Sequence, residues 1–231
     1  MCRRRSFFTL ALSSRRGYNK GIRERKKVLR LKELLLRIRA LLSRLTSGGE
    51  NEPLAAAAAV ALNLLEKGDL YAGGPALTAV ADGLPDDIRI DPADPMMAAG
   101  AACALQRKNE GGVVVASAAE SDRLYASIAL AVKLSLPLVL LVSCREANVD
   151  ELSSRVMAAD MECIPADGRG VMKLMPALRL AVDKAREGDG PTLIECVRDL
   201  PLDDEDTPAD PLERLNSVLI LEGYAMPEEL L

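Results

Sequence analysis

Polar and charged side chains that could bind a ligand follow two of the strands that the sequence predicts. Ser117 and Glu120 come directly after one predicted strand, and Ser143 closes the next, with Arg145 two residues beyond it. At a helix N-terminus, Ser117 and backbone N–H groups could hold a phosphate. Arg145, at the carboxyl edge of a sheet, could bind a phosphate or a carboxylate directly. Ser117 and Glu120 also fit a capping box, in which they only begin a helix.

Several chemistries are excluded because the sequence contains no histidine. There can be no Ser-His-Asp or Cys-His catalysis and no histidine metal ligand. The cysteines are widely spaced, without a C-x-x-C pair, which indicates free thiols in a reducing compartment rather than zinc ligands. They are Cys2, Cys103, Cys144, Cys163 and Cys196. From these residue types we assign no catalytic residue and no metal ligand.

Charge is distributed unevenly along the 231 residues. Residues 1–45 hold 15 basic side chains against Glu24 and Glu33, a net charge of +13, and the remainder holds 15 basic and 32 acidic side chains, a net charge of −17. We therefore predict a basic N-terminal arm, residues 1–23, joined to one α/β domain, residues 24–231. The arm could bind an anionic membrane, nucleic acid, a partner subunit or the body of its own chain. Nucleic-acid binding is disfavoured because no nucleic-acid motif accompanies the charge.

The N-terminal segment does not fit a secretory signal. Its apolar stretch, residues 7–12, is shorter than the roughly 7 to 15 residues of a signal core, and no small-residue cleavage site follows. No run approaches the eighteen or so apolar residues that span a bilayer. The expected location is the cytoplasm, with an organellar matrix as the alternative, because the segment is rich in Arg and Ser and lacks acids before Glu24.

The elements that must position these residues alternate along the chain. An amphipathic basic helix and an Ala-rich helix come first, and residues 69–96, rich in Gly and Pro, are predicted as a loop. Strands and helices then alternate, which is typical of a doubly wound parallel sheet with helices on both faces. The expected helices are 24–45, 53–66, 97–107, one from the cap at Ser117 to about 135, one from the cap at Asn148 to 159, and 170–187. The expected strands are 113–116, 138–143, 162–165 and 192–197.

Two features follow the last predicted strand. The acidic stretch 203–206 is interpreted as a solvated loop, with a divalent-cation site as the weaker alternative because the spacing of a calcium loop is absent. A helix after Asp210-Pro211 and a short acidic one end the sequence.

One stretch of the sequence resembles a known family. Residues 163–197 contain Ile164-Pro165, Asp167-Gly168, Ala185-Arg186 and the run Gly190-Pro191-Thr192-Leu193-Ile194-Glu195. In that order they resemble the alpha subunit of thiamine-diphosphate-dependent 2-oxo acid dehydrogenases of the pyruvate and branched-chain type. The resemblance implies the thiamine-diphosphate-binding version of the doubly wound fold.

Weaker similarities extend this resemblance over most of residues 25–231. They comprise Gly49-Glu50 and Gly68-Asp69 in the region of the family's Gly-Gln-Glu-Ala helix, Gly100-Ala101-Ala102, Lys133 with Leu136-Pro137, the run Asp210 to Leu215, and the Glu228-Glu229-Leu230 ending.

The family's cofactor motifs are absent from the matching positions. The family holds Mg²⁺ and the diphosphate with Gly-Asp-Gly after one strand and Asn-Asn after the next. Here the first falls on Val115-Ala116-Ser117, within one residue, and the second on Cys144-Arg145. An arginine opposes Mg²⁺ electrostatically, and a hard cation requires oxygen ligands. The family's Tyr-Arg-Gly-His segment is reduced to Tyr71-Ala72-Gly73-Gly74.

The resemblance therefore implies thiamine diphosphate and Mg²⁺ as cofactors that this chain does not bind in the usual way. The degenerate cofactor-binding positions are Ser117, Glu120, Ser143 and Arg145, and Glu120, Asp122, Ser143 and Asn148 are the oxygen ligands that could substitute.

Four hypotheses remain open at this point. The first is a structural or regulatory alpha-like subunit that partners a beta-type dehydrogenase subunit or another copy of itself. The second is an active enzyme that decarboxylates a 2-oxo acid with a beta-type partner. The third is a binding module that uses Arg145 for an anion or phosphate metabolite, and the fourth is an interaction protein that uses the basic arm.

Overall fold

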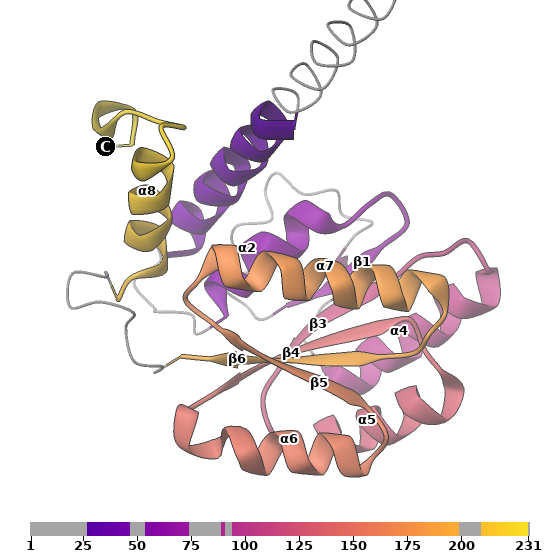
Figure 1. The fold of residues 1–231 in the computed structure, drawn as a ribbon. Coiled ribbons are helices and arrows are strands. Elements are labelled where there is room, and N and C mark those ends of the chain that lie inside the picture. Colours follow the sequence, from indigo (N-terminus) through magenta and orange to yellow (C-terminus); the bar gives the residue numbers. More distant parts are fainter. Residues whose placement is uncertain (1–26, 47–53, 74–88, 91–93, 199–208, 231) are drawn as a thin grey trace, which may run out of the picture. The chain divides into compact units, whose positions relative to one another are not determined.

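The computed structural model describes residues 27–46, 54–73, 89–90, 94–198 and 209–230 (Figure 1). The chain divides into two compact units, Met1–Arg37 and Ile38–Leu231. Of the first unit only residues 27–37 are described, and they form the first part of a helix that continues to residue 46. The predicted basic arm and the predicted acidic loop at 203–206 lie outside the described residues, so both stay predictions.

A six-stranded sheet lies at the centre of the second unit. Its order is β2-β1-β3-β4-β6-β5, and every neighbouring pair is parallel. The predicted doubly wound parallel sheet is thus confirmed. The strands are β1 (Leu70–Ala72), β2 (Arg89–Ile90), β3 (Val114–Ala118), β4 (Leu138–Cys144), β5 (Glu162–Asp167) and β6 (Thr192–Val197).

Two of these strands correct the expectation of a loop over 69–96. β1 has three residues and β2 has two, and Gly and Pro residues lie between them. Runs this short carry no alternating pattern that sequence analysis can detect. Their pairing with β3 and with each other, not local propensity, defines them as strands.

Helices cover both faces of the sheet, as predicted. α4 (Pro95–Lys108), α5 (Asp122–Leu134) and α6 (Val149–Ala158) lie on one face, and α2 (Ala55–Leu64) and α7 (Val171–Glu187) lie on the other (Figure 1). α7 packs against β4, β5 and β6 as well as against α2. The tail forms α8 (Pro211–Leu221), as predicted, and the expected short acidic helix is a 3₁₀ turn, η4 (Pro227–Glu229).

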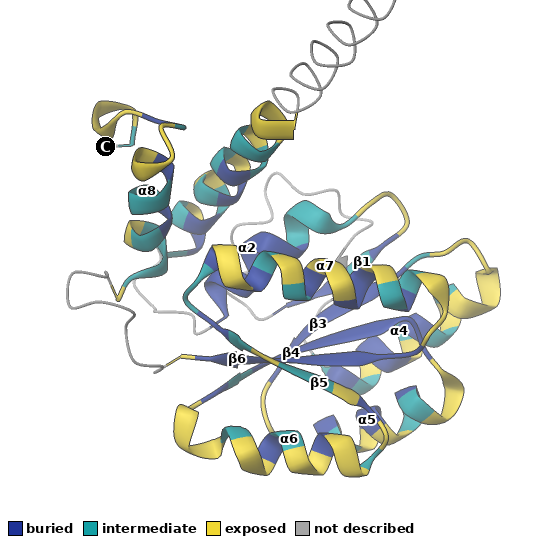
Figure 2. Ribbon diagram, viewed as in Figure 1, coloured by how far each residue is buried: buried dark blue, intermediate teal, exposed yellow. Residues whose placement is uncertain are grey.

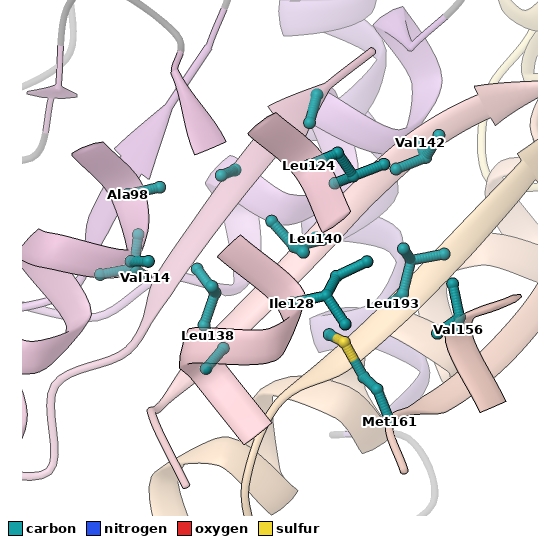
Figure 3. Close-up of a cluster of buried hydrophobic side chains, with 14 of the residues drawn as sticks. Ala98, Val114, Leu124, Ile128, Leu138, Leu140, Val142, Val156, Met161 and Leu193 are labelled. Atoms are coloured by element: carbon teal, nitrogen blue, oxygen red, sulfur yellow. The ribbon is translucent and has the colours of Figure 1, made fainter. Parts of the chain in front are cut away.

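The central strands β3, β4 and β6 are buried almost throughout (Figure 2). In β4, Leu138, Leu140 and Val142 join the core cluster that contains Leu124 and Ile128 of α5 (Figure 3). Because side chains alternate across a strand, the intervening residues of β4 face α2 and α7. A strand covered on both faces explains the unbroken apolar run from which it was predicted.

The start of α5 corrects a predicted cap. β3 continues through Ser117 to Ala118, and the N-cap is Ser121, whose Oγ accepts a hydrogen bond from the Leu124 N–H at 3.3 Å. Ser117 and Glu120 therefore form no capping box, and Ser117 is not at a helix N-terminus. Serines at 117 and 121 could both cap this helix. Because Ser117 belongs to the buried strand β3, the helix begins after Ser121.

Other helix starts follow their local signals. Asp210 caps α8 by accepting from the Leu212 and Glu213 N–H groups at 2.8 and 2.9 Å, with Pro211 in the first helical position. Asn148 is the N-cap of α6, as predicted, but its side chain makes no capping hydrogen bond. A 3₁₀ turn, η3 (Glu146–Asn148), directly precedes α6.

Asp69 connects several segments at the amino edge of the sheet. Its side chain is buried and accepts hydrogen bonds from the Glu66 and Val113 N–H groups, both at 2.8 Å, and it forms an ion pair with Arg186 of α7. A side chain at Gly112 would come within 2.7 Å of the Gly68 carbonyl, so this close approach requires glycine.

β5 forms one edge of the sheet and contains Pro165. The Gly168 N–H donates to the Val197 carbonyl of β6 at 2.8 Å. Because successive backbone groups of a strand point to alternate sides, the nitrogen of Pro165, three residues earlier, faces away from β6. Proline is tolerated in an edge strand at such a position because no ladder hydrogen bond is lost.

Within the described part of the chain, no helix combines the length and the apolarity that crossing a bilayer requires.

Candidate functional site

The carboxyl edge of the sheet is where parallel α/β proteins bind ligands, because strands end and helices begin there. All four predicted site residues lie within the last two residues of a strand or shortly after its end. Ser117 and Ser143 belong to β3 and β4, and Glu120 and Arg145 follow these strands. The structure nevertheless divides them between the two faces of the sheet.

Ser117 lies on the face that α2 and α7 cover. It is buried, and its Oγ is 2.7 Å from the Oη of Tyr71 in β1. One of these hydroxyls donates to the other, so each already has a partner in the folded chain. Ser117 therefore connects two neighbouring strands, and its hydroxyl is engaged in that contact.

Glu120 lies on the other side, in a network of α5 and α6. Its Oε1 accepts from the Tyr125 hydroxyl at 2.6 Å and lies 3.5 Å from Nη1 of Arg155. Arg155 also pairs with Glu151 at 2.8 Å, and its guanidinium carbon lies 5.5 Å from the centre of the Tyr125 ring. Burial, reinforced by the hydrogen bond to Glu120, raises the pKa of Tyr125. This exposed network links two helices, so Glu120 already has two partners.

Ser143 and Arg145 lie on the same face as Ser117. The Oγ of Ser143 is buried and has no hydrogen-bond partner within the described part of the chain. Arg145 is exposed and is the N-cap residue of η3, with an extended backbone. Since alternate residues of a strand share a face, Arg145 follows Ser143 on the side of α7.

Sequence reasoning missed a second arginine beside Arg145. Arg198 directly follows β6, and its N–H donates to the Cys144 carbonyl at 3.1 Å, which continues the ladder between β4 and β6. Cys144 pairs with Val197 in register, so Arg145 and Arg198 come next to each other. A sequence signal existed, because Arg198 directly follows the predicted strand 192–197 and Arg145 lies two residues beyond the predicted strand 138–143. Using it required knowledge of which strands are neighbours.

A buried ion pair lies beside these arginines. Asp167, at the end of β5, is 4% exposed and pairs with Arg214 of α8 at 2.8 Å, whose side chain is 12% exposed. Asp167 also accepts the Arg169 N–H at 3.0 Å. A Cβ at Gly168 would lie 3.1 Å from the Cys196 backbone, which explains the glycine after Asp167. This carboxylate is therefore committed to holding the tail helix.

A cavity of about 620 Å³ opens beyond the end of β5. Three carboxylates, Glu146, Asp150 and Asp167, line it together with Lys173. The remaining lining residues are Val149, Pro165, Ala166, Ala177 and Val197. Asp167 is neutralised by Arg214, so the walls retain two acidic groups and one basic group.

The residues at this edge do not fit Mg²⁺ and a diphosphate bound through it. Three of the positions where a metal or diphosphate ligand is expected do not offer one. The hydroxyl of Ser117 is hydrogen-bonded to Tyr71, Glu120 accepts a hydrogen bond from Tyr125 of α5, and Arg145 carries a positive charge. Asp122 and Asn148, the other expected oxygen ligands, belong to the first turn of α5 and the end of η3. A hard cation requires several oxygen ligands that converge on one point. Among the described residues, no three acidic or thiol side chains converge in this way.

A second polar cluster lies inside the face covered by α6, and sequence reasoning missed it too. Glu195 of β6 is fully buried, and its Oε2 accepts from the Ser153 hydroxyl at 2.7 Å and lies 3.9 Å from the sulfur of Cys163. Its Oε1 has no hydrogen-bond partner within the described residues. Burial raises the pKa of Glu195, an effect that hydrogen bonds from Ser153, Cys144 and Cys163 oppose.

The four described cysteines are free thiols, as predicted; Cys2 lies outside the described residues. Burial raises the pKa of Cys163 to about 11 and raises that of Cys196 still further. Both therefore remain protonated at neutral pH and lack the thiolate character of a reactive cysteine.

No protein-family profile and no curated protein sequence matches the chain. Among solved structures, transketolase from Campylobacter jejuni is similar with a TM-score of 0.51 and 12% identity, over 87% of this chain and 44% of that one. A protein from Mycobacterium smegmatis described as a thiamin diphosphate-dependent enzyme gives a TM-score of 0.44 and 17% identity, over 62% of this chain and 31% of that one. The chain thus spans less than half the length of either structure.

At these identities the similarity to transketolase shows the fold alone. The chain shares a parallel α/β fold with that transketolase, which agrees with the predicted doubly wound sheet.

Proposed function

We propose that this chain is a structural or regulatory subunit that keeps the fold of a thiamine-diphosphate-dependent enzyme without its metal-dependent cofactor site. The resemblance to the alpha subunit of 2-oxo acid dehydrogenases supports this role, with a beta-type subunit as the partner. The single observation that carries the proposal is the exposed Arg145 at the carboxyl end of β4, where the family places an Mg²⁺ ligand.

Electrostatics provides the physical reason. A guanidinium and a divalent cation repel each other, and neither Ser117 nor Glu120 is free to compensate with an oxygen ligand. A chain without this site can still contribute the surfaces of its fold to an assembly. In this proposal the chain keeps the fold of the enzyme and lacks the residues that bind the metal and the cofactor.

Titration calorimetry tests the cofactor half of the proposal. Thiamine diphosphate should bind to the full chain no more tightly in the presence of Mg²⁺ than in the presence of a chelator. Tight binding that requires Mg²⁺ would contradict the proposal and favour an active enzyme. Release of CO₂ from a 2-oxo acid, with a beta-type subunit added, would contradict it as well.

The outer face of α7 supports the second part of the proposal, that the chain binds a partner subunit. It carries a shallow apolar groove of about 470 Å³, lined by Met172, Met175, Pro176, Arg179, Leu180 and Asp183. Leu180 is 59% exposed, which leaves its apolar surface in water unless another subunit covers it. We assign this groove to the beta-type subunit.

A matched pair of substitutions tests the groove. Leu180→Glu should abolish co-purification with a beta-type subunit, since burying a charge without a partner in an apolar interface is costly. Met157→Glu, on α6 at the other face of the sheet, changes a side chain that is 57% exposed and should leave co-purification intact. Equal co-purification of both variants would show that the partner does not use α7.

A further inference from the structure

The carboxyl edge of β4 and β6 carries two positive charges whose purpose the subunit role does not explain. Neither Arg145 nor Arg198 has a hydrogen-bond or ion-pair partner for its side chain among the described residues. Both are exposed, and both directly follow the end of a strand. Two unpaired guanidinium groups beside each other repel, so their proximity favours a ligand that neutralises both.

The sheet places both arginines on one face. β4 sends Val142 and Cys144 into the core cluster on the side of α5 and α6, and β6 sends Leu193 and Val197 there. The alternating residues therefore lie on the α7 side: Ser143 and then Arg145 in β4, Cys196 and then Arg198 in β6. Neighbouring strands lie about 4.8 Å apart, so the two backbones present these side chains within reach of one small ligand.

Ser143 supplies an uncommitted hydrogen-bonding group at the same place. It lies two residues before Arg145, about 7 Å along the strand, on the same face. Its Oγ is buried and has no partner within the described part of the chain, although buried hydroxyls are nearly always hydrogen-bonded. A ligand atom between the two strand ends would satisfy it.

Among the described residues, the charges around Arg145 and Arg198 leave the site positive. Asp167, a buried carboxylate at the end of the neighbouring strand β5, is neutralised by Arg214. The N-terminus of α7, capped by Gly170 without a side-chain hydrogen bond, begins at the same edge and contributes a partial positive charge. Glu146 and Asp150 line the cavity beyond β5. Their carboxylates repel an anion there, which favours its binding on the side of Arg145 and Arg198.

We propose that Arg145, Arg198 and the hydroxyl of Ser143 form a metal-independent binding site for a phosphate-type dianion. Two guanidinium groups match two negative charges and the several acceptor oxygens of a phosphate, whereas a carboxylate offers one charge and two oxygens. The site goes beyond the proposed subunit role because it gives this edge a ligand of its own. It needs no cation, since the arginines supply the charge.

Titration calorimetry of the full chain with inorganic phosphate, in the presence of a chelator, tests the site. The wild-type chain should bind phosphate saturably in the millimolar range or tighter, sulfate comparably, and acetate more weakly. Arg145→Gln and Arg198→Gln should each raise the Kd for phosphate about tenfold, because each removes a charge-assisted hydrogen bond. Ser143→Ala should raise it roughly threefold.

Arg107→Gln is the matched control. Arg107 is an exposed arginine in the last turn of α4, so the variant makes the same change in charge away from the site and should bind phosphate like wild type. Circular dichroism should show all these variants folded, since the arginines are exposed and Ser143→Ala removes only a hydroxyl that has no partner among the described residues. Equal losses in the Arg107 and Arg145 variants, acetate binding as tight as phosphate, or no saturable binding by wild type would each overturn the inference. None of these outcomes bears on thiamine diphosphate and Mg²⁺, so the subunit proposal is tested separately.

Discussion

Replacing Arg214 by leucine should lower the free energy of unfolding by about 3 to 5 kcal/mol, the usual cost of leaving one member of a buried ion pair without its partner. Asp167 is 4% exposed and would keep a carboxylate that water cannot reach, without the guanidinium that neutralises it, although the Arg169 N–H would still donate to it. A urea titration at neutral pH measures the effect. Because folded domains are only marginally stable, a loss of this size is a large share of the total.

The double variant Arg214→Leu/Asp167→Asn separates the ion pair from simple packing. Removing the orphaned charge should recover part of the lost stability, since the two residues are coupled. Arg179→Leu, on the exposed side of α7, should change the free energy of unfolding by less than about 0.5 kcal/mol. If the Arg214 and Arg179 variants were equally stable, the ion pair would not hold α8 to the sheet.

Glu195 should make the folded chain less stable as the pH rises from acid to neutral. Burial raises its pKa above the ordinary value of 4.5, so in the pH range between these two values the folded chain keeps a proton that the unfolded chain has lost. The contribution of Glu195 to stability is therefore greatest below pH 4.5, falls by up to about 1.4 kcal/mol per pH unit through that range, and levels off above the raised pKa. Glu195→Gln, which is neutral at every pH, should remove this fall.

Urea titrations at several pH values compare this variant with Glu162→Gln. Glu162 lies on the neighbouring edge strand, pairs with Lys184 at 2.7 Å and is 44% exposed, so its replacement should leave the fall in place. A wild-type chain whose stability rises from pH 5 to 7, in step with the Glu195→Gln variant, would show that Glu195 is charged in the fold.

The central elements were predictable because their signals are local. β6 was predicted as 192–197 and is observed at Thr192–Val197, since an apolar run follows directly after a glycine and a proline. β4 was predicted one residue short of its observed end at Cys144. α7, predicted over 170–187, begins at Val171 because Gly170 is its N-cap. For the two strands, burial on both faces and a turn signal agree, and for α7 a buried apolar side agrees with a glycine at each end of the helix.

The site was less predictable because it depends on contacts between distant residues. The hydroxyl of Ser117 is engaged by Tyr71, 46 positions earlier, in a strand too short to detect. Arg198 lies beside Arg145 only because β6 inserts between β4 and β5, an order that sequence spacing does not reveal. Glu195 sits in a run whose other residues are apolar, and only the position of Ser153 on α6 explains it.

Pro165 also constrains how this protein can associate with others. A flat edge strand with free N–H groups invites another chain to add a strand, which is a common route to aggregation and to domain swapping. In β5 Pro165, one of the positions whose nitrogen faces outward, has no N–H to donate, and at the opposite edge β2 has only two residues. The sheet is thus poorly suited to growth by strand addition at either edge. Specific association is left to the helical surfaces, where side chains rather than backbone choose the partner.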